Sequence, residues 1–246
     1  MRHSADSLLD KNYLTSYFLS DDKMRSRSVS NSILASTLDL AALPARLVAD
    51  CEREIHGHLK LEAGDVETLS LARARMRWPD YSQYFNAMAL WTKQVGLGHL
   101  LSESDVALMA CRGAKYHHDG EQYGSAAFCN LFLSEDKGLD LHFPLAGKRF
   151  ALSRGTAVIF DTCQPHAVIR RDKHGFDAAD FPVNADNALL FLSWELDIEN
   201  AQVAHALQIA FDTSVPSALT LPQEQVWLNG KRMTICSDSG GVQILP

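Results

Sequence analysis

Two histidines and an aspartate are the residues of this chain whose types and spacing best suit metal chemistry. His117 and Asp119 lie in the segment KYHHDG, and His166 lies in the segment TCQPHAVIRR. If the first segment is extended, alternate side chains point to the same side, so His117 and Asp119 project together and His118 points away. Two imidazoles and one carboxylate can hold an iron ion and leave positions open for oxygen and a bidentate ligand. We therefore predict that His117, Asp119 and His166 form a mononuclear metal site.

Other interpretations of the same histidines stay open at this point. The segment HHDGEQYG is also typical of a polar turn exposed to water, because Asp-Gly is a turn signal. His118 could bind the metal in place of His117. The position of His166 at the start of an apolar strand favours the metal site over the turn. His142, beside Phe143, is predicted to be a structural histidine with satisfied hydrogen bonds.

The second half of the chain carries the strands that must position these residues. From residue 106 onward, short apolar, β-branched or aromatic runs alternate with Gly, Asp, Ser and Pro, which is typical of a sandwich or barrel. Gly147 and Gly155 are predicted turn residues, and Asn229-Gly230 predicts a two-residue hairpin. The predicted strands are VALMACRG, SAAFCNLFLS, LDLHFPL, KRFALS, TAVIFDT, HAVIRR and ALLFLSWELDI.

The first half of the chain has helical periodicity. Apolar residues recur every four residues in the segments 43–55 and 84–95, which predicts two amphipathic helices. The serine-rich stretch 16–36 is expected to be an exposed connection. We predict an α+β fold in which a mainly helical N-terminal region, residues 1–105, supports a β core, residues 106–246, within one structural domain.

The region from about residue 105 to residue 198 resembles the 2-oxoglutarate/Fe(II) oxygenase superfamily. The resemblance rests on the HxD pair of His117 and Asp119, followed by GTAVIFD and by PHAV, which contains His166. It implies a double-stranded β-helix (jelly roll) as the core, with Fe(II) as cofactor and 2-oxoglutarate and O2 as co-substrates. The implied reaction is hydroxylation or another oxidation of a C–H bond, with 2-oxoglutarate cleaved to succinate and carbon dioxide.

The chain departs from this family where the co-substrate binds. Family members commonly carry an Arg or Lys on the strand after the second histidine, but NALLFLSWELD has no basic residue. Arg170, four residues after that histidine, faces the same way in an extended strand, so we predict that it pairs with the far carboxylate of 2-oxoglutarate. Lys115, Tyr123 and Asn130 are further candidates for co-substrate binding. The inserted segment 171–186 is predicted to be a lid over the site.

Two alternatives stay open, and the missing basic residue suggests the first of them. The chain could be a jelly-roll binding or scaffold protein whose metal site no longer uses 2-oxoglutarate. It could also be a cupin-like metalloenzyme that uses another metal. Cupin sites usually contain more histidines, so Asp119 argues against the second alternative.

Composition narrows the partners and the compartment. The net charge of −7 and the pI of about 5.8 argue against nucleic acid, whose phosphates require a basic surface. The five cysteines include no CxxC pair, which favours reduced thiols in the cytoplasm over a disulfide-stapled secreted domain. No apolar run approaches the ~20 residues of a membrane span, and the charged N-terminal segment does not resemble a signal peptide. We expect a cytoplasmic protein that acts on a small-molecule substrate, with the oligomeric state left open.

Overall fold

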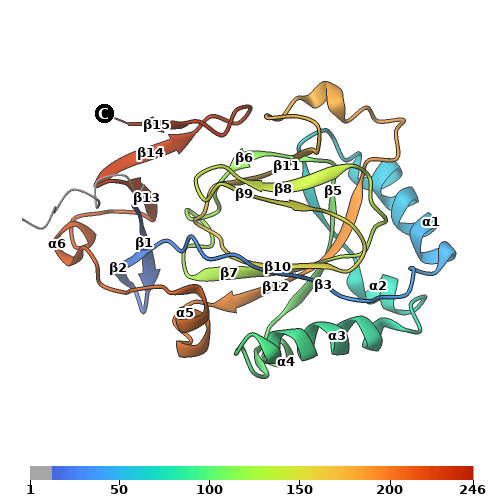
Figure 1. Cartoon of the computed structure of the whole chain (residues 1–246), viewed down its shortest axis with the longest axis horizontal. Coiled ribbons are helices and arrows are strands. Elements are labelled where there is room, and N and C mark those ends of the chain that lie inside the picture. Colours follow the sequence, from blue (N-terminus) through green and yellow to red (C-terminus); the bar gives the residue numbers. More distant parts are fainter. Residues whose placement is uncertain (1–12, 246) are drawn as a thin grey trace, which may run out of the picture.

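Two antiparallel sheets form the centre of the computed structural model, which describes residues 13–245 (Figure 1). The strands of the larger sheet are β3 (Leu34–Thr37), β4 (Val66–Leu69), β5 (Val106–Cys111), β7 (Ala126–Phe132), β10 (Thr156–Asp161) and β12 (Leu189–Asp197). Those of the smaller sheet are β6 (Ala114–His117), β8 (Leu139–Phe143), β9 (Lys148–Ala151) and β11 (His166–Arg170). The strand orders are β3-β10-β7-β12-β5-β4 and β6-β11-β8-β9. Between β5 and β12 the chain passes repeatedly from one sheet to the other. These strands confirm every strand that the sequence predicts between residues 106 and 198.

Strand β12 shows how the larger sheet separates two environments. Its residues Leu190, Leu192 and Trp194 belong to an apolar cluster shared with the helices, whereas Phe191 belongs to the cluster between the two sheets. This follows from the two-residue period of a strand, which places successive side chains on opposite faces. The larger sheet therefore packs against helices on one face and against the smaller sheet on the other.

Four helices of the first half lie along the outer face of the larger sheet. They are α1 (Ala45–Glu54), α2 (Leu71–Arg75), α3 (Tyr81–Gln94) and α4 (Leu100–Glu103), with the π-helix η1 (Ile55–Leu59) continuing α1. The buried residues Leu47 and Cys51 of α1 and Tyr84, Met88 and Trp91 of α3 contact this face, as their four-residue spacing predicts. No described helix combines the length and hydropathy of a membrane-spanning segment.

The first half also contributes strands, which its helical periodicity did not predict. β3 and β4 form the two edges of the larger sheet. β1 (Leu14–Ser20) and β2 (Lys23–Ser28) join β13 (Gln225–Leu228), β14 (Lys231–Ile235) and β15 (Val242–Ile244) in a third sheet, ordered β15-β14-β13-β1-β2. The predicted hairpin is confirmed, since Leu228 pairs with Lys231 across Asn229-Gly230.

The serine-rich stretch 16–36 is not an exposed connection, so this expectation was wrong. Ser16, Ser26 and Ser30 are buried, because the stretch forms β1, β2 and β3. Serine is small enough to sit between packed sheets when its hydroxyl finds a partner, as Ser30 does with the carbonyl of Leu207. No signal peptide is expected in the charged N-terminal segment. Residues 1–12 of that segment lie outside the described residues.

The remaining helices connect the core to the third sheet. They are α5 (Ala201–Leu207) and α6 (Val215–Ala218), which follow β12 along the chain. A short 3-10 helix, η2 (Ala178–Asp180), lies in the segment between β11 and β12.

Candidate metal centre

The structure brings together the three side chains that the sequence predicts as metal ligands. His117 is the last residue of β6, Asp119 follows in the loop, and His166 is the first residue of β11. β6 and β11 are neighbours, and His166 is paired directly with His117. One ligand atom from each of the three residues lies within 4.8 Å of the others, and no other such cluster occurs within residues 13–245.

The carboxylate of Asp119 approaches both imidazoles. Its Oδ1 is 3.5 Å from Nε2 of His117, and its Oδ2 is 3.6 Å from Nε2 of His166. Ligand atoms that each lie about 2 Å from one metal ion are separated by roughly 3 Å or slightly more, so only a small contraction is needed to close around an ion. His118 makes a different contact, because its Nδ1 accepts a hydrogen bond from the backbone N–H of Gly120.

Hydrogen bonds to the backbone orient both imidazoles. Nδ1 of His117 lies 2.6 Å from the carbonyl oxygen of Lys115, and Nδ1 of His166 lies 2.9 Å from that of Gln164. A carbonyl oxygen can only accept, so each Nδ1 carries the proton and the lone pair of each Nε2 is left for a metal ion. This arrangement, in which the far ring nitrogen donates to a fixed acceptor, is typical of histidine metal ligands.

Burial sets the protonation of the centre. Desolvation lowers the pKa of His166 well below its usual value, and the nearby His117 adds to this effect, while the hydrogen bond to Gln164 opposes it. Desolvation also raises the pKa of Asp119, an effect that the charge of His117 opposes. A neutral imidazole is the form that binds a metal, so His166 is held in the ligand form.

The two ligand-bearing loops are fastened to each other. The backbone N–H of Asp119 donates to the carbonyl of Thr162, and the Thr162 hydroxyl donates to the carbonyls of Tyr123 and Ala126. A Cβ at Gly120 would lie 2.5 Å from a methyl of Val226, so only glycine fits at this close approach. The Asp-Gly pair therefore serves close packing of the ligand loop.

A buried ion pair anchors the same region to β2. Arg27 and Asp161 are both fully buried, and the guanidinium donates to both carboxylate oxygens, at 2.6 and 2.9 Å. Arg27 also donates to the carbonyl of Gly124, and Asp161 accepts from the backbone N–H groups of Ser30 and Cys163. The pair thus joins the loop after Asp119, the loop before His166 and the third sheet.

The three residues open into a cavity of about 360 Å³ between the two sheets. Aromatic rings form much of its wall, and the ring of Phe160 packs against that of His166 with centroids 4.8 Å apart. The acidic residues that line it are Asp119, Asp105 and Glu195, and no lysine or arginine lines it. The other lining residues are Val66, Thr68, Val106, Ala107, Met109, Cys111, Ala114, Tyr123, Phe128, Asn130, Phe132, Leu141, Val168, Phe191 and Ser193.

Of the predicted co-substrate residues, Tyr123 and Asn130 line this cavity and Lys115 does not. Lys115 is exposed and packs beside Gly64. The prediction failed because the register between β6 and β11 is irregular: His117 pairs with His166, but Ala114 pairs with Val168. Such an irregularity changes which side chains face inward, so the strict alternation assumed for this segment does not hold.

Arg170 also lies outside the cavity, contrary to the prediction. It is the last residue of β11, and its guanidinium lies 3.6 Å from the carboxylate of Asp172, with 39% of the side chain exposed. Arg170 lies an even number of residues after His166, as the prediction assumed. On this strand, however, only His166 and Val168 line the cavity. Arg170 therefore lies farther along β11 than the residues that line the cavity.

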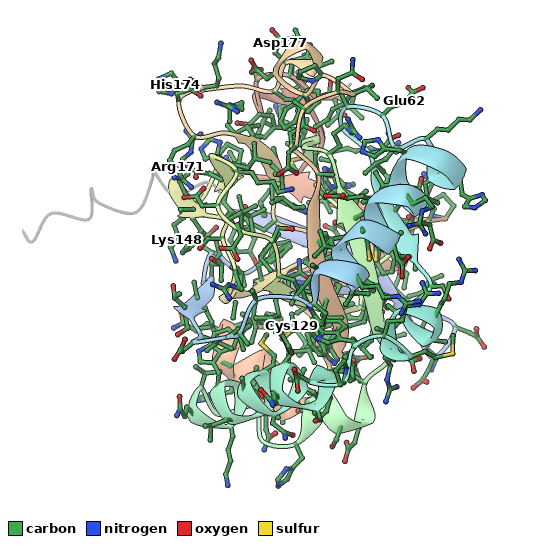
Figure 2. The ribbon with its side chains drawn as sticks, turned by 90° about the vertical axis from the view of Figure 1, so that its right-hand side faces the viewer. Glu62, Cys129, Lys148, Arg171, His174 and Asp177 are labelled. Atoms are coloured by element: carbon green, nitrogen blue, oxygen red, sulfur yellow. The ribbon has the colours of Figure 1, made fainter. Side chains whose placement is uncertain are left out.

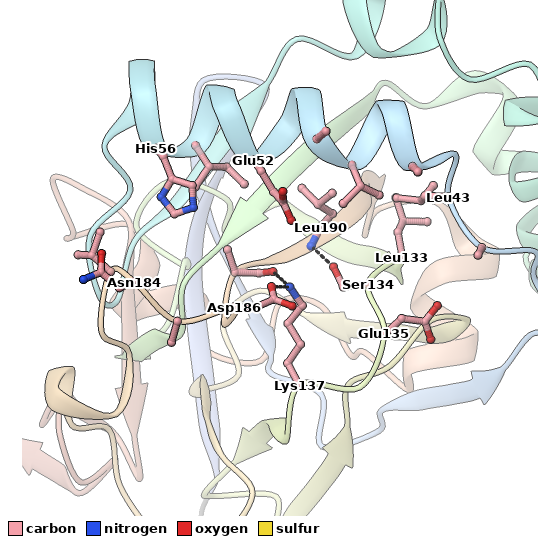
Figure 3. Close-up of a pocket in the computed structure, with 18 residues that line it drawn as sticks. Leu43, Glu52, His56, Leu133, Ser134, Glu135, Lys137, Asn184, Asp186 and Leu190 are labelled. Carbon is pink, nitrogen blue, oxygen red and sulfur yellow. Dashed lines mark hydrogen bonds and ion pairs between the residues drawn. The ribbon is translucent and has the colours of Figure 1, made fainter.

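The inserted segment 171–186 does not line the metal cavity either, so the lid prediction was wrong. Phe176 and Phe181 are buried and stacked on each other, and Figure 2 shows His174 and Asp177 at one end of the molecule. Residues 183–186 instead line a larger cavity of about 940 Å³ beside α1, where Lys137 contacts Asp186 (Figure 3). This second cavity contains no cluster of metal-ligating groups.

The sequence interpretation missed Asp105, Ser193 and Glu195 as cavity residues. Ser193 and Glu195 alternate with the apolar residues of NALLFLSWELD, and together with Phe191 they occupy the inward face of β12. A polar residue at every second position of an otherwise apolar strand was the signal available, because such positions share one face.

Comparisons with known proteins give structural likeness only. No family model matches the chain, and no curated protein matches it in sequence. The chain is similar to a viral collagen prolyl hydroxylase from Paramecium bursaria Chlorella virus-1, with 12% identity, a TM-score of 0.42, and coverage of 73% of this chain and 94% of that one. For a Pseudomonas putida prolyl-4-hydroxylase the identity is 19%, the TM-score 0.38, and the coverage 67% and 92%. For the epimerase SnoN in complex with Fe3+, α-ketoglutarate and nogalamycin RO the identity is 12%, the TM-score 0.36, and the coverage 85% and 90%.

Proposed function

We propose that this chain is a mononuclear non-haem Fe(II) oxygenase that uses 2-oxoglutarate to oxidise a C–H bond of a small molecule. The observation that carries the proposal is the convergence of His117, Asp119 and His166 at the mouth of a mainly apolar cavity. Two imidazoles and one carboxylate, with the remaining side left free, suit Fe(II) in oxygenases. The alternation of strands between the two sheets agrees with a jelly-roll core.

Each part of the centre has a separate role in this proposal. His117 and His166 supply Nε2 and Asp119 supplies a carboxylate oxygen to the metal. Bound iron supplies dioxygen activation coupled to decarboxylation of 2-oxoglutarate. The rings of Phe128 and Phe160 keep water away from the centre, which limits side reactions of the oxidant.

The cavity fits the two ends of 2-oxoglutarate unequally. The open side of the metal triad suits the oxo-acid end, whereas no lysine or arginine lines the cavity to pair with the far carboxylate. We propose that the neutral donors of Tyr123 and Asn130 hold that carboxylate instead. Neutral hydrogen bonds are weaker than an arginine pair, so 2-oxoglutarate should bind less tightly than a basic anchor would allow.

The absence of a lysine or arginine from the cavity wall also favours one alternative function. A binding protein that retains the metal site but does not use 2-oxoglutarate would also lack a basic anchor. The two functions differ in a single measurable property, the binding of 2-oxoglutarate to the iron-loaded centre.

An anaerobic titration tests the proposal without knowledge of the substrate. Fe(II) and then 2-oxoglutarate are added to metal-free protein, and the visible spectrum is followed for a weak charge-transfer band. We expect the band to appear only when both are present, to vanish in His166→Ala and to weaken in Tyr123→Phe. The variant His174→Ala is the matched control, because His174 lies outside the cavity.

Two results would reject parts of the proposal. If His166→Ala retains iron as tightly as the unaltered protein, the ligand assignment is wrong. If iron binds but no band forms with 2-oxoglutarate, the binding-protein alternative replaces the oxygenase.

A further inference from the structure

We propose that the substrate carries a positively charged group, a protonated amine or a guanidinium, which pairs with Glu195 and Asp105 at the cavity mouth. This inference rests on the proposed function and assigns the substrate class of the same site. It starts from the charge balance of the cavity wall, where Asp105, Asp119 and Glu195 are present without a lysine or arginine. Asp119 faces the metal, which leaves two carboxylates for another cation.

The two carboxylates lie side by side on the larger sheet. Trp194 of β12 pairs with Val106 of β5, and the next residues along these antiparallel strands are Glu195 and Asp105. Both side chains line the cavity and are exposed to water. Among residues 13–245, no lysine, arginine or histidine lies within 4 Å to form an ion pair with either of them. Two unpaired carboxylates on one rim attract a cation from solution.

A buried amide deeper in the cavity points independently to a ligand. Asn130 is only 7% exposed and lines the cavity, and its Oδ1 accepts no hydrogen bond from the described part of the chain. A buried acceptor without a donor is costly, so a bound molecule that offers N–H or O–H is favoured there. Ser193, which pairs with Asn130 across the sheet, lies between this amide and Glu195 on the inner face. Ionised 2-oxoglutarate offers no such donor, so the Oδ1 of Asn130 is left for the substrate, while its amide N–H is the donor assigned above to the co-substrate.

The sheet also sets the length of that molecule. Glu195 pairs with Phe128, and Phe128 pairs with Phe160, whose ring packs on the imidazole of His166. Two strand spacings separate Glu195 from Phe160, or about 10 Å. A molecule that pairs with Glu195 and reaches the aromatic wall beside His166 therefore spans about this distance, with apolar surface between its two ends.

Matched probes of equal shape and different charge test the inference. The probes are 4-phenylbutylamine, which is protonated at pH 7, and the neutral 4-phenylbutanol. Their dissociation constants are measured by calorimetry on the anaerobic protein, both with Fe(II) and 2-oxoglutarate and without them. We expect the ammonium probe to bind about ten-fold more tightly than the alcohol. Glu195→Gln should reduce this ratio about three-fold, and the double variant with Asp105→Asn should bring it close to one, as suits partly solvated charge pairs.

The control removes an equal charge from an edge strand of the same sheet. Glu67 lies on β4 between Val66 and Thr68, which line the cavity, while Glu67 itself does not. Glu67→Gln should leave the ratio unchanged, and unaltered binding of the alcohol shows that each variant keeps its cavity. Equal binding of the two probes, or a ratio that the double variant leaves intact, would overturn the inference. Because the ratio is also measured without iron, it can hold even if the charge-transfer band fails to form.

Discussion

At the scale of single residues, the position of Arg170 leads to a clear expectation. Its guanidinium is half exposed beside Asp172 and does not line the cavity. Arg170→Ala should therefore leave iron binding and the affinity for 2-oxoglutarate within about two-fold of the unaltered protein, since exposed pairs contribute little. The anaerobic titration measures both. A loss as large as that of Tyr123→Phe would restore Arg170 as the co-substrate anchor.

The cysteines provide a second prediction at this scale. Burial raises the pKa of the Cys51 thiol to about 11 and the pKa values of the Cys111 and Cys163 thiols to about 12, and it raises that of Cys129 further. Hydrogen bonds from Ser239 lower the pKa of Cys236, which is partly exposed. The thiolate is the reactive form, so Cys236 has a larger reactive fraction than the four buried thiols.

We expect one fast-reacting thiol when the folded protein is titrated with a disulfide reagent at pH 7.5. The rate should rise with pH, because a higher pH increases the thiolate fraction of Cys236. The fast phase should be absent from Cys236→Ser, and the other thiols should react only after unfolding. A second fast thiol in the folded protein would contradict the burial described above.

The residue types and their spacing were enough to predict the candidate metal ligands. The residues around these ligands could be predicted only in part. The HxD pair and the later histidine need only short-range alternation, which the sequence displays. Lys115 was misplaced because a register irregularity is a property of two paired strands and leaves no mark in either one alone. Asp105 was missed because its place at the cavity follows from pairing with β12, which is distant in sequence.

At the scale of elements, the packing of β2 against the ligand loops leads to a stability prediction. Arg27→Met leaves the buried Asp161 without its cation, which should lower the free energy of unfolding by about 3–5 kcal/mol. Urea denaturation measures the change. The matched control on the same strand is Arg25→Met, which removes partly exposed pairs with Glu199 and Asp212 and should cost at most about 1 kcal/mol.

If the two substitutions lower the free energy of unfolding equally, the buried pair does not stabilise the loops. A double variant, Arg27→Met with Asp161→Leu, separates the causes, because removing both charges abolishes the penalty of an unpaired buried carboxylate. We expect it to be more stable than Arg27→Met alone.

Strands and helices of this chain differ in how well the sequence predicts them. The strands after residue 105 are apolar runs bounded by turn residues, and α1 and α3 have clear four-residue periods, so local pattern suffices. β1 and β2 are rich in serine and arginine, which lowers their apparent strand character. They are stabilised by pairing with β13 near the other end of the chain, a contact that no local pattern reveals.

At the scale of the whole molecule, iron should stabilise the fold measurably. The three ligands come from segments that separate on unfolding, so the metal binds the folded state preferentially. At a free iron concentration of 100 times the dissociation constant, the stabilisation is about 2.7 kcal/mol. For a chain of this length this corresponds to a rise of roughly 5–10 °C in Tm. Anaerobic calorimetry of the unaltered protein and of His166→Ala tests this, and an equal rise in both would contradict the assigned centre.

The two faces of β12 have a consequence for protein engineering. Its even-numbered residues hold the helices to the sheet, while Phe191, Ser193 and Glu195 face the cavity. A library randomised at the three inward positions would alter ligand preference and leave the helix-packing residues of the strand untouched.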